Sequence, residues 1–147
     1  MATVADFEEV RVLEHVKTSG LLDGFTDING QLKAAPKLFV SEIDLSTLQA
    51  NQRAVLFRTS GNDQLQQTVL TMTEKPFSIF VFGRVGIEDA GIIKGYAQDL
   101  ESWIRQNPRN LDQCIVDIQS LSFNGPFQDE TSRRIYEINL LVKFIKK

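Results

Sequence analysis

The spacing of apolar positions separates the chain into segments with different periods. The clearest helix is predicted from about Ile87 to Gln106, because apolar residues there recur at intervals of three and four. On a helical cylinder these residues gather on roughly one third of the circumference: Ile92, Ile93, Tyr96, Leu100, Trp103 and Ile104. Polar residues occupy the opposite side, and Pro108 ends the pattern. An amphipathic helix with one face against a core is therefore expected.

A weaker helix is predicted over residues 3–17. Its apolar residues recur every three positions: Val4, Phe7, Val10, Leu13 and Val16. A repeat of three drifts around a cylinder that has 3.6 residues per turn. This helix is therefore expected to contact more than one neighbour. The Gly- and Asp-rich stretch that follows, residues 18–31, predicts a long connection.

The remaining segments favour strands. A short strand is expected at 36–45, a hairpin from 53–60 and 66–74, and the strongest strand at 76–85. In that strand both alternating sets are apolar, so both faces of the sheet need covering. Two closing strands, 114–123 and 133–145, are expected with a loop at 124–132. The order predicts one α+β domain over residues 1–147, with a mostly antiparallel (mixed) sheet of four to five strands packed by two main helices.

Composition narrows the function classes. A chain of 147 residues with 42% hydrophobic residues can bury one core without disulfides. The net charge of -3 lacks the basic footprint of a typical nucleic-acid reader. A single cysteine, an acidic N-terminal stretch and apolar runs too short for a membrane span favour a soluble cytosolic protein without a secretory signal.

The stretch FGRVGIEDAG, residues 82–91, lies where a phosphate-binding loop would join a strand to a helix. Gly83 and Gly86 are separated by two residues, so the Gly-x-Gly of a dinucleotide loop is missing, as is the Gly-Lys of a P-loop. Glu88 and Asp89 in the first helical turn would repel an incoming anion. The glycines are therefore expected to serve a turn and close packing.

The search for catalytic or metal-binding groups predicts neither an enzyme nor a cofactor. His15 is the single histidine, and it is expected to be a surface or partly buried residue of the first helix. Cys114 is expected to be a small buried residue at the start of a strand. The three acidic pairs, at 8–9, 88–89 and 129–130, are expected to be solvated or to begin helices.

Two features of the sequence are not explained by the packing of a hydrophobic core alone. Gly91 and Gly95 lie four residues apart on one side of the second helix, next to Ser102 and beside the apolar stripe. They are either tolerated near a helix start or form a flat strip that admits another backbone. The loop at 124–134 carries Phe127, Arg133 and Arg134, and it is either a simple connection or a docking loop.

The order of these parts resembles the tail terminator (tail completion) proteins of long-tailed bacteriophages. The likeness covers residues 76–145 in most detail: an aromatic strand ending near Arg84, the helix with Tyr96, Leu100 and Trp103, and two closing strands. The last strand carries a pattern R-x-Y-x-x-N-L at Arg134, Tyr136, Asn139 and Leu140.

The resemblance implies a structural subunit that caps the finished tail tube, stops its polymerisation and presents a head-tail joining surface. Its partners would be other copies of itself, typically in a hexameric ring, the tail tube protein and the head-side connector. DNA would pass through the lumen without specific binding, and no membrane is involved. The protein would reside in the host cytoplasm during assembly and then in the virion tail.

A ring built head to tail needs two different complementary patches on each subunit. One is hypothesised at Glu88, Gly91 and Gly95, and the other on the sheet edge or the 124–134 loop, with Phe127, Asp129, Arg133 and Arg134. Two alternatives remain open. The chain could be a stand-alone α+β domain that binds a small ligand or regulates another protein, or another tail component such as a sheath or baseplate protein.

Overall fold

The computed structural model describes residues 8–26, 30–59, 64–65, 72–129 and 131–145 of the chain. Two α-helices lie within these ranges, α1 (Glu8–Lys17) and α2 (Ala90–Gln106). The strands are β1 (Phe25–Thr26), β2 (Leu32–Lys33), β3 (Lys37–Val40), β4 (Ala54–Thr59), β5 (Gln64–Leu65), β6 (Met72–Val85), β7 (Ile115–Gln128) and β8 (Arg133–Ile145). Short 3-10 turns connect several of them.

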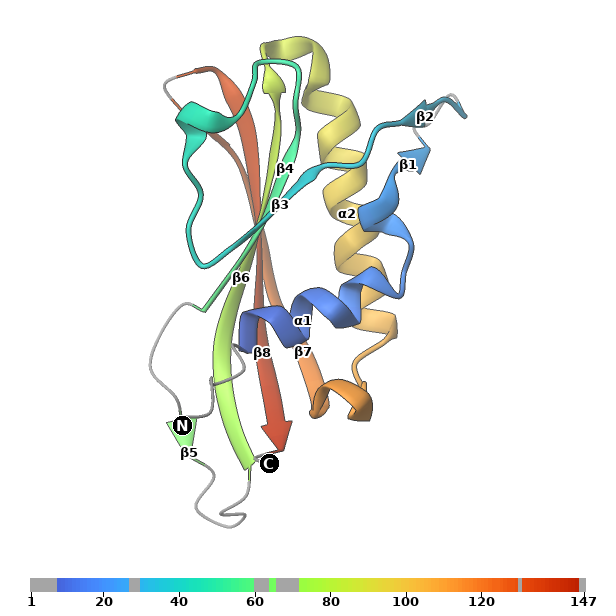
Figure 1. Cartoon of the computed structure of the whole chain (residues 1–147), viewed down its shortest axis with the longest axis vertical. Helices are drawn as coiled ribbons and strands as arrows, with labels where there is room; N and C mark the ends of the chain where they lie inside the picture. Colours follow the sequence, from blue (N-terminus) through green and yellow to red (C-terminus); the bar gives the residue numbers. More distant parts are fainter. Residues whose placement is uncertain (1–7, 27–29, 60–63, 66–71, 130, 146–147) are drawn as a thin grey trace, which may run out of the picture.

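One mixed sheet organises the molecule, with the strand order β3-β4-β6-β8-β7 (Figure 1). The β3–β4 pair is parallel, and the remaining pairs along this path are antiparallel. The two-residue strand β5 pairs with the beginning of β6, and β1 and β2 form a separate small pair. Two helices and a mixed sheet with five strands along its path confirm the predicted α+β class.

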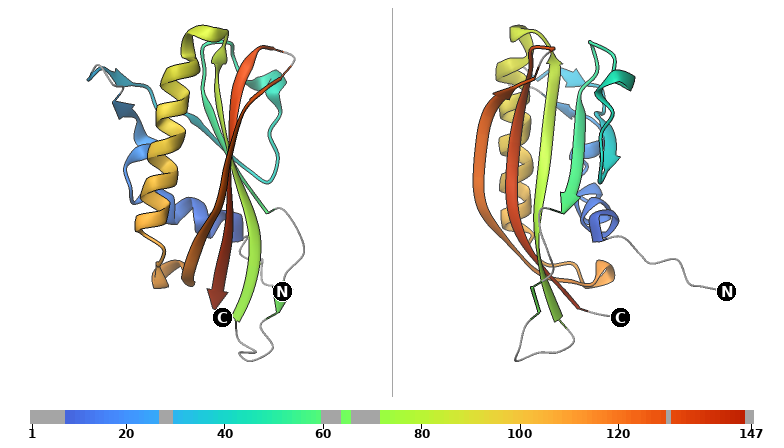
Figure 2. Two further views of the ribbon diagram at one scale, coloured as in Figure 1. Left: turned by 180° about the vertical axis from the view of Figure 1, so that it is seen from behind. Right: turned by 90° about the vertical axis from the view of Figure 1, so that its left-hand side faces the viewer.

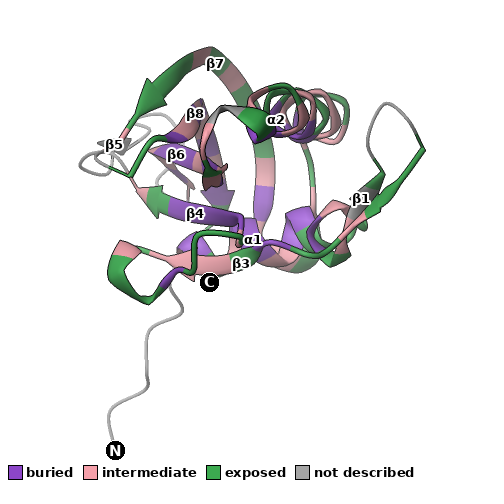
Figure 3. Cartoon of the chain, turned by 90° about the horizontal axis from the view of Figure 1, so that it is seen from above, coloured by how far each residue is buried: buried purple, intermediate pink, exposed green. Residues whose placement is uncertain are grey.

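Both helices cover the same face of the sheet, with α2 beside β7 and β8 and α1 near β4 (Figures 2 and 3). Alternate strand residues point into this main core, as the period of two predicts. From β8 these are Tyr136, Ile138, Leu140, Val142 and Phe144, and from α2 they are Ile93, Tyr96, Ala97, Leu100 and Ile104. The predicted helix and the predicted buried face of the last strand are therefore confirmed.

A second, smaller core lies on the opposite face of the sheet. Leu56 and Phe82 point there, and Leu48 of the segment that precedes β4 covers them. Ile79 and Val81 of β6 belong to the main core on the other side. The prediction that both faces of this strand need covering is thus confirmed.

Three predicted boundaries differ from the structure. The partner of β4 in the hairpin is the strand Phe77–Phe82 and not residues 66–74, of which 66–71 lie outside the described residues. Strand β7 continues through most of the predicted 124–132 loop, because it keeps pairing with β8 as far as Gln128 across three register shifts. Cys114 is half-buried, with a left-handed φ of 59°, and lies just before β7 instead of opening a buried strand.

The described part of the first predicted helix is α1, and Val4 and Phe7 lie outside the described residues. Its core contacts are Val12, Leu13 and Val16, whereas Val10 is 38% exposed. The helix packs against β4 and also contacts the residues that follow α2, so the prediction that it touches more than one neighbour is confirmed. Glu9 lies in the first turn of α1, as expected for a helix-start charge, but it is buried, and its carboxylate accepts a 2.7 Å hydrogen bond from the Ser41 hydroxyl.

His15 joins α1 to the end of α2. Its Nε2–H donates to the Asn107 carbonyl at 2.7 Å, and its Nδ1 accepts from the Asn110 side-chain amide at 3.1 Å. The ring also lies against Trp103, with the ring centres 4.9 Å apart. Both nitrogens of the neutral imidazole are therefore satisfied in a buried position. Burial lowers the pKa of His15, and the hydrogen bond to Asn107 opposes this in part.

This brace predicts a loss of stability in mild acid. The unfolded histidine titrates near 6.5 and the folded one lower, so the unfolded chain binds the proton first as the pH falls. The contribution of His15 is complete above about pH 6.5 and decreases as the pH drops toward the folded pKa. Urea unfolding from pH 7.5 to about 5.5 should show this slope, and His15→Gln should flatten it. Equal slopes in both proteins would contradict the assignment.

Substitution by alanine is predicted to have opposite effects on stability at Gly95 and at Gly125. A Cβ at Gly95 would meet no heavy atom within 4 Å, so Gly95→Ala should stabilise the helix by about 0.5–1 kcal/mol. At Gly125 the φ is +129° and a Cβ would lie 2.8 Å from the Ile135 carbonyl oxygen, so Gly125→Ala should destabilise the fold. Chemical denaturation of the two variants measures both. A destabilised Gly95→Ala would refute the view that this face of α2 is open.

Candidate functional site

Three chain turns meet at one end of the sheet, at the upper end in Figure 1. They are the turn from β6 into α2, the turn from β7 into β8, and the segment that leads into β4. Val85 at the end of β6 pairs with Arg133 at the start of β8, and its N–H donates to the Ala50 carbonyl at 3.0 Å. This end of the molecule, defined by residues 48–53, 83–91 and 127–134, is here called the sheet apex.

Arg133 lies at the centre of the sheet apex and is only 2% exposed. Its terminal nitrogens donate to the carbonyls of Gln52 at 2.7 Å, Gly83 at 2.8 Å, Gln49 at 2.7 Å and Leu48 at 3.4 Å. Burial lowers the pKa of Arg133, and the charge of Asp129 opposes the shift. The Arg133 side chain thus joins the segment before β4 to the end of β6. The prediction that Arg133 lies on an exposed docking loop is wrong.

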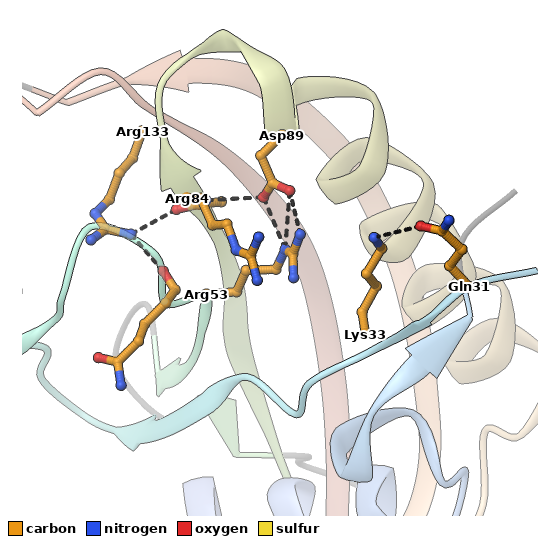
Figure 4. Close-up of polar contacts among 8 residues, drawn as sticks. Gln31, Lys33, Arg53, Arg84, Asp89 and Arg133 are labelled. Atoms are coloured by element: carbon orange, nitrogen blue, oxygen red, sulfur yellow. Dashed lines mark hydrogen bonds and ion pairs between the residues drawn. The ribbon is translucent and has the colours of Figure 1, made fainter. Parts of the chain in front are cut away.

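A buried ion pair lies beside it (Figure 4). The Arg53 Nε lies 2.9 Å from Asp89 Oδ2 and 3.2 Å from Oδ1, and an Arg53 terminal nitrogen also donates to Oδ1. Asp89 accepts a further hydrogen bond from the Arg84 backbone N–H at 3.0 Å. Asp89 lies at the start of α2, as expected, but it is 5% exposed and therefore not solvated. Its neighbour Glu88 is exposed, as expected.

The glycines before α2 have the roles that the sequence predicted for them. A Cβ at Gly83 would lie 3.1 Å from Ile93 Cγ2 and 3.2 Å from Asp89 Oδ2, so this position requires close packing. Gly86 has a φ of +99°, which favours glycine in the turn. The anionic group at the start of α2 is thus the Asp89 carboxylate of the chain itself, and it pairs with Arg53.

Gly91 and Gly95 lie outside the buried residues of α2, and Gly95 is three residues after Ile92, at the border of the apolar stripe. Gly91 is exposed and Gly95 half-buried, and a Cβ at either would meet nothing within 4 Å. No close contact in the described part of the chain therefore requires glycine at these two positions. Together with Glu88 they form an open strip, here called the helix patch.

The other hypothesised residues occupy the turn between β7 and β8. Phe127 on β7 is 50% exposed and pairs with Ile135, as expected for a surface aromatic. Asp129 shapes the turn by accepting from the N–H groups of Thr131 at 3.0 Å and Arg133 at 2.8 Å. Arg134 is half-buried, and its guanidinium donates to the Gln128 side chain at 2.6 Å. Phe127 and Arg134 are here called the turn patch, since Asp129 is used within the turn itself.

The sequence reading missed a basic cavity of about 260 Å³ at the sheet apex. Its lining comprises Ala34, Ala35, Lys37, Gln49, Asn51, Gln52, Arg53 and Arg84. Lys37, Arg53 and Arg84 are far apart in the sequence, and no motif spacing links them, so only the fold brings them together. In the described residues, no group of three or more His, Cys, Asp or Glu could hold a metal ion, and no helix is long and apolar enough to cross a membrane.

Comparisons with known proteins add no family assignment: no family model matches the chain, and no curated protein sequence matches it.

The Arg53–Asp89 pair predicts a large effect of a nearly isosteric change. Asp89→Asn would leave Arg53 buried without its counter-charge and should lower the free energy of unfolding by about 3–5 kcal/mol. The matched control, Glu88→Gln, alters an exposed neighbour and should stay within about 0.5 kcal/mol of the parent. Urea denaturation of both variants measures the difference. Similar stabilities in the two variants would show that the ion pair does not support the sheet apex.

Proposed function

We propose that the chain is a structural assembly protein of a long-tailed phage particle, a tail terminator that caps the tail tube and forms the head-tail joining surface. Two lines of support lead to this proposal. The order of sequence patterns over residues 76–145 resembles that family. The chain also folds as a small α+β unit with a long amphipathic helix on a mixed sheet, the type of subunit that the resemblance implies.

The observation that carries the assembly proposal is the helix patch. Glycine within a helix costs up to about 1 kcal/mol relative to alanine. Gly83 has a packing reason inside the chain, but Gly91 and Gly95 have none among the described residues. A flat strip at these positions would let the backbone of a neighbouring subunit approach α2 closely.

A second patch is required for a head-to-tail ring, because such contacts join two different surfaces of identical subunits. The turn patch supplies an exposed aromatic ring, Phe127, and a cationic group, Arg134, at neighbouring register positions of the β7–β8 pair. Aromatic and arginine side chains are enriched at protein interfaces. Strand β7 is also the last strand of the sheet, so its outer edge faces no further strand in the described fold.

In this proposal the subunit binds copies of itself in a ring, typically of six, and then the tail tube protein and the head-side connector. DNA passes through the lumen without specific binding, no reaction is catalysed, and no cofactor is needed. The subunit acts in the host cytoplasm and then in the virion tail. The alternative of a small apolar ligand held between helix and sheet gains no support from the cavity, whose lining is mainly polar and basic.

The proposal predicts that side-chain size at Gly95 controls assembly. Native mass spectrometry over a wide concentration range should show a closed oligomer for the parent and for Gly95→Ala. Gly95→Leu should remain a folded monomer, since its side chain would project into the interface and not into the core. Lys17→Leu adds the same side chain to an exposed position of α1 and should assemble normally.

Two results would count against the proposal. Normal assembly of Gly95→Leu would remove the helix patch from the interface. A parent protein that stays monomeric, both alone and when mixed with purified tail tubes, would contradict the ring itself. Circular dichroism and urea unfolding of each variant separate a block in assembly from a failure to fold.

A further inference from the structure

The basic cavity at the sheet apex has no part in the proposed subunit contacts at the helix patch and the turn patch. Three cationic residues, Lys37, Arg53 and Arg84, line it, and its described lining includes no acidic residue. One carboxylate, Asp89, lies against Arg53, so two positive charges remain without a local counter-charge. This concentration is notable in a chain whose net charge is -3.

Arg84 is the side chain that this arrangement leaves unsatisfied. Its Nε is buried and has no hydrogen-bond partner in the described structure, although its backbone N–H is bound to Asp89. Arg84 and Arg53 line the same cavity, and both side chains are drawn in Figure 4. Like charges that line one cavity repel each other, and an anion bound there would reduce that repulsion.

The walls of the cavity are fixed by contacts on their far sides. Arg133 holds the carbonyls of Gln49 and Gln52, and the Gln49 N–H donates to the Gln52 side-chain oxygen at 3.0 Å. The Gln52 amide nitrogen is therefore the end of that side chain that can still donate. The Lys37 N–H donates to the Arg53 carbonyl at 2.9 Å, which ties the start of β3 to the start of β4. A preorganised set of donors loses little entropy on binding.

We propose that this cavity binds a phosphate group, with Arg84, Arg53 and Lys37 around it and the Gln52 amide as a further donor. Guanidinium groups bind phosphate oxygens with paired hydrogen bonds, and lysine adds a point charge. A phosphate monoester carries a charge of about -1.5 to -2, which matches the two uncompensated positive charges. The volume of about 260 Å³ admits a phosphate group with part of what carries it. This inference does not depend on the proposed assembly role.

The test is a titration of the folded protein with inorganic phosphate, followed by backbone amide NMR at constant ionic strength in chloride. Saturable shifts are expected at residues 34–37, 49–53 and 84. Arg84→Gln should weaken the affinity about tenfold or more, the usual value of a charge-assisted hydrogen bond. Arg58→Gln removes an exposed arginine of β4 that does not line the cavity, and it should bind as the parent does.

Further probes identify where the phosphate comes from. Methyl phosphate binding without binding of dimethyl phosphate or a short DNA duplex would assign a small phosphomonoester. Binding of the last two at the same residues would assign a nucleic-acid backbone. Acetate binding as tight as phosphate, absence of saturation, or equal losses in Arg84→Gln and Arg58→Gln would each overturn the proposal. Neither variant should have a lower urea midpoint than the parent, because neither side chain contributes a hydrogen bond in the described structure, so a loss of binding would not reflect a loss of the fold.

Discussion

The sheet apex depends on a buried cation. Moving a guanidinium out of water is costly unless its donors find acceptors, and Arg133 finds them in four backbone carbonyls. Those carbonyls come from the segment before β4 and from the end of β6, while the arginine opens β8. The contact therefore forms only when three distant parts of the chain are in register. The carbonyls in turn gain a partner that no strand provides for them.

The second buried arginine extends the same logic. Arg53 pairs with Asp89, and Asp89 also receives the N–H of Arg84. The start of α2 is thereby fixed to the strand before it and to the segment leading into β4. Because these internal contacts hold the walls of the apex, Lys37 and the Arg84 guanidinium are left at the basic cavity. The same internal hydrogen bonds that hold the segments around the cavity leave Arg84 Nε without a partner, and this arrangement supports the proposal of an anion site.

The sequence pattern predicted the elements in which one side is buried along the whole length of the helix or strand. The α2 stripe and the alternation in β8 each repeat over many residues, so the pattern outweighs local irregularity. The partner of β4 was mistaken because the choice between two adjacent β-rich segments depends on tertiary pairing. Arg133 and Arg134 show the limit most clearly. Alternation along β8 places them on opposite faces, but no local signal shows that residues 48–52 fold over the first and leave the second accessible. The basic cavity was missed for the same reason.

The glycines of one short stretch separate internal causes from external ones. Gly83 is required by Ile93 and Asp89, and Gly86 by its positive φ, so the fold explains both. Gly91 and Gly95 follow within ten residues, yet a Cβ at either position would meet no heavy atom within 4 Å. A helix that needs stability alone would gain from alanine there, since alanine has the higher helix propensity. A helix that must admit a neighbouring backbone would tolerate alanine at these positions. It would lose assembly only when a larger side chain is introduced. The dependence on side-chain size, and not the presence of glycine, is therefore the property that separates an interface from a tolerated sequence.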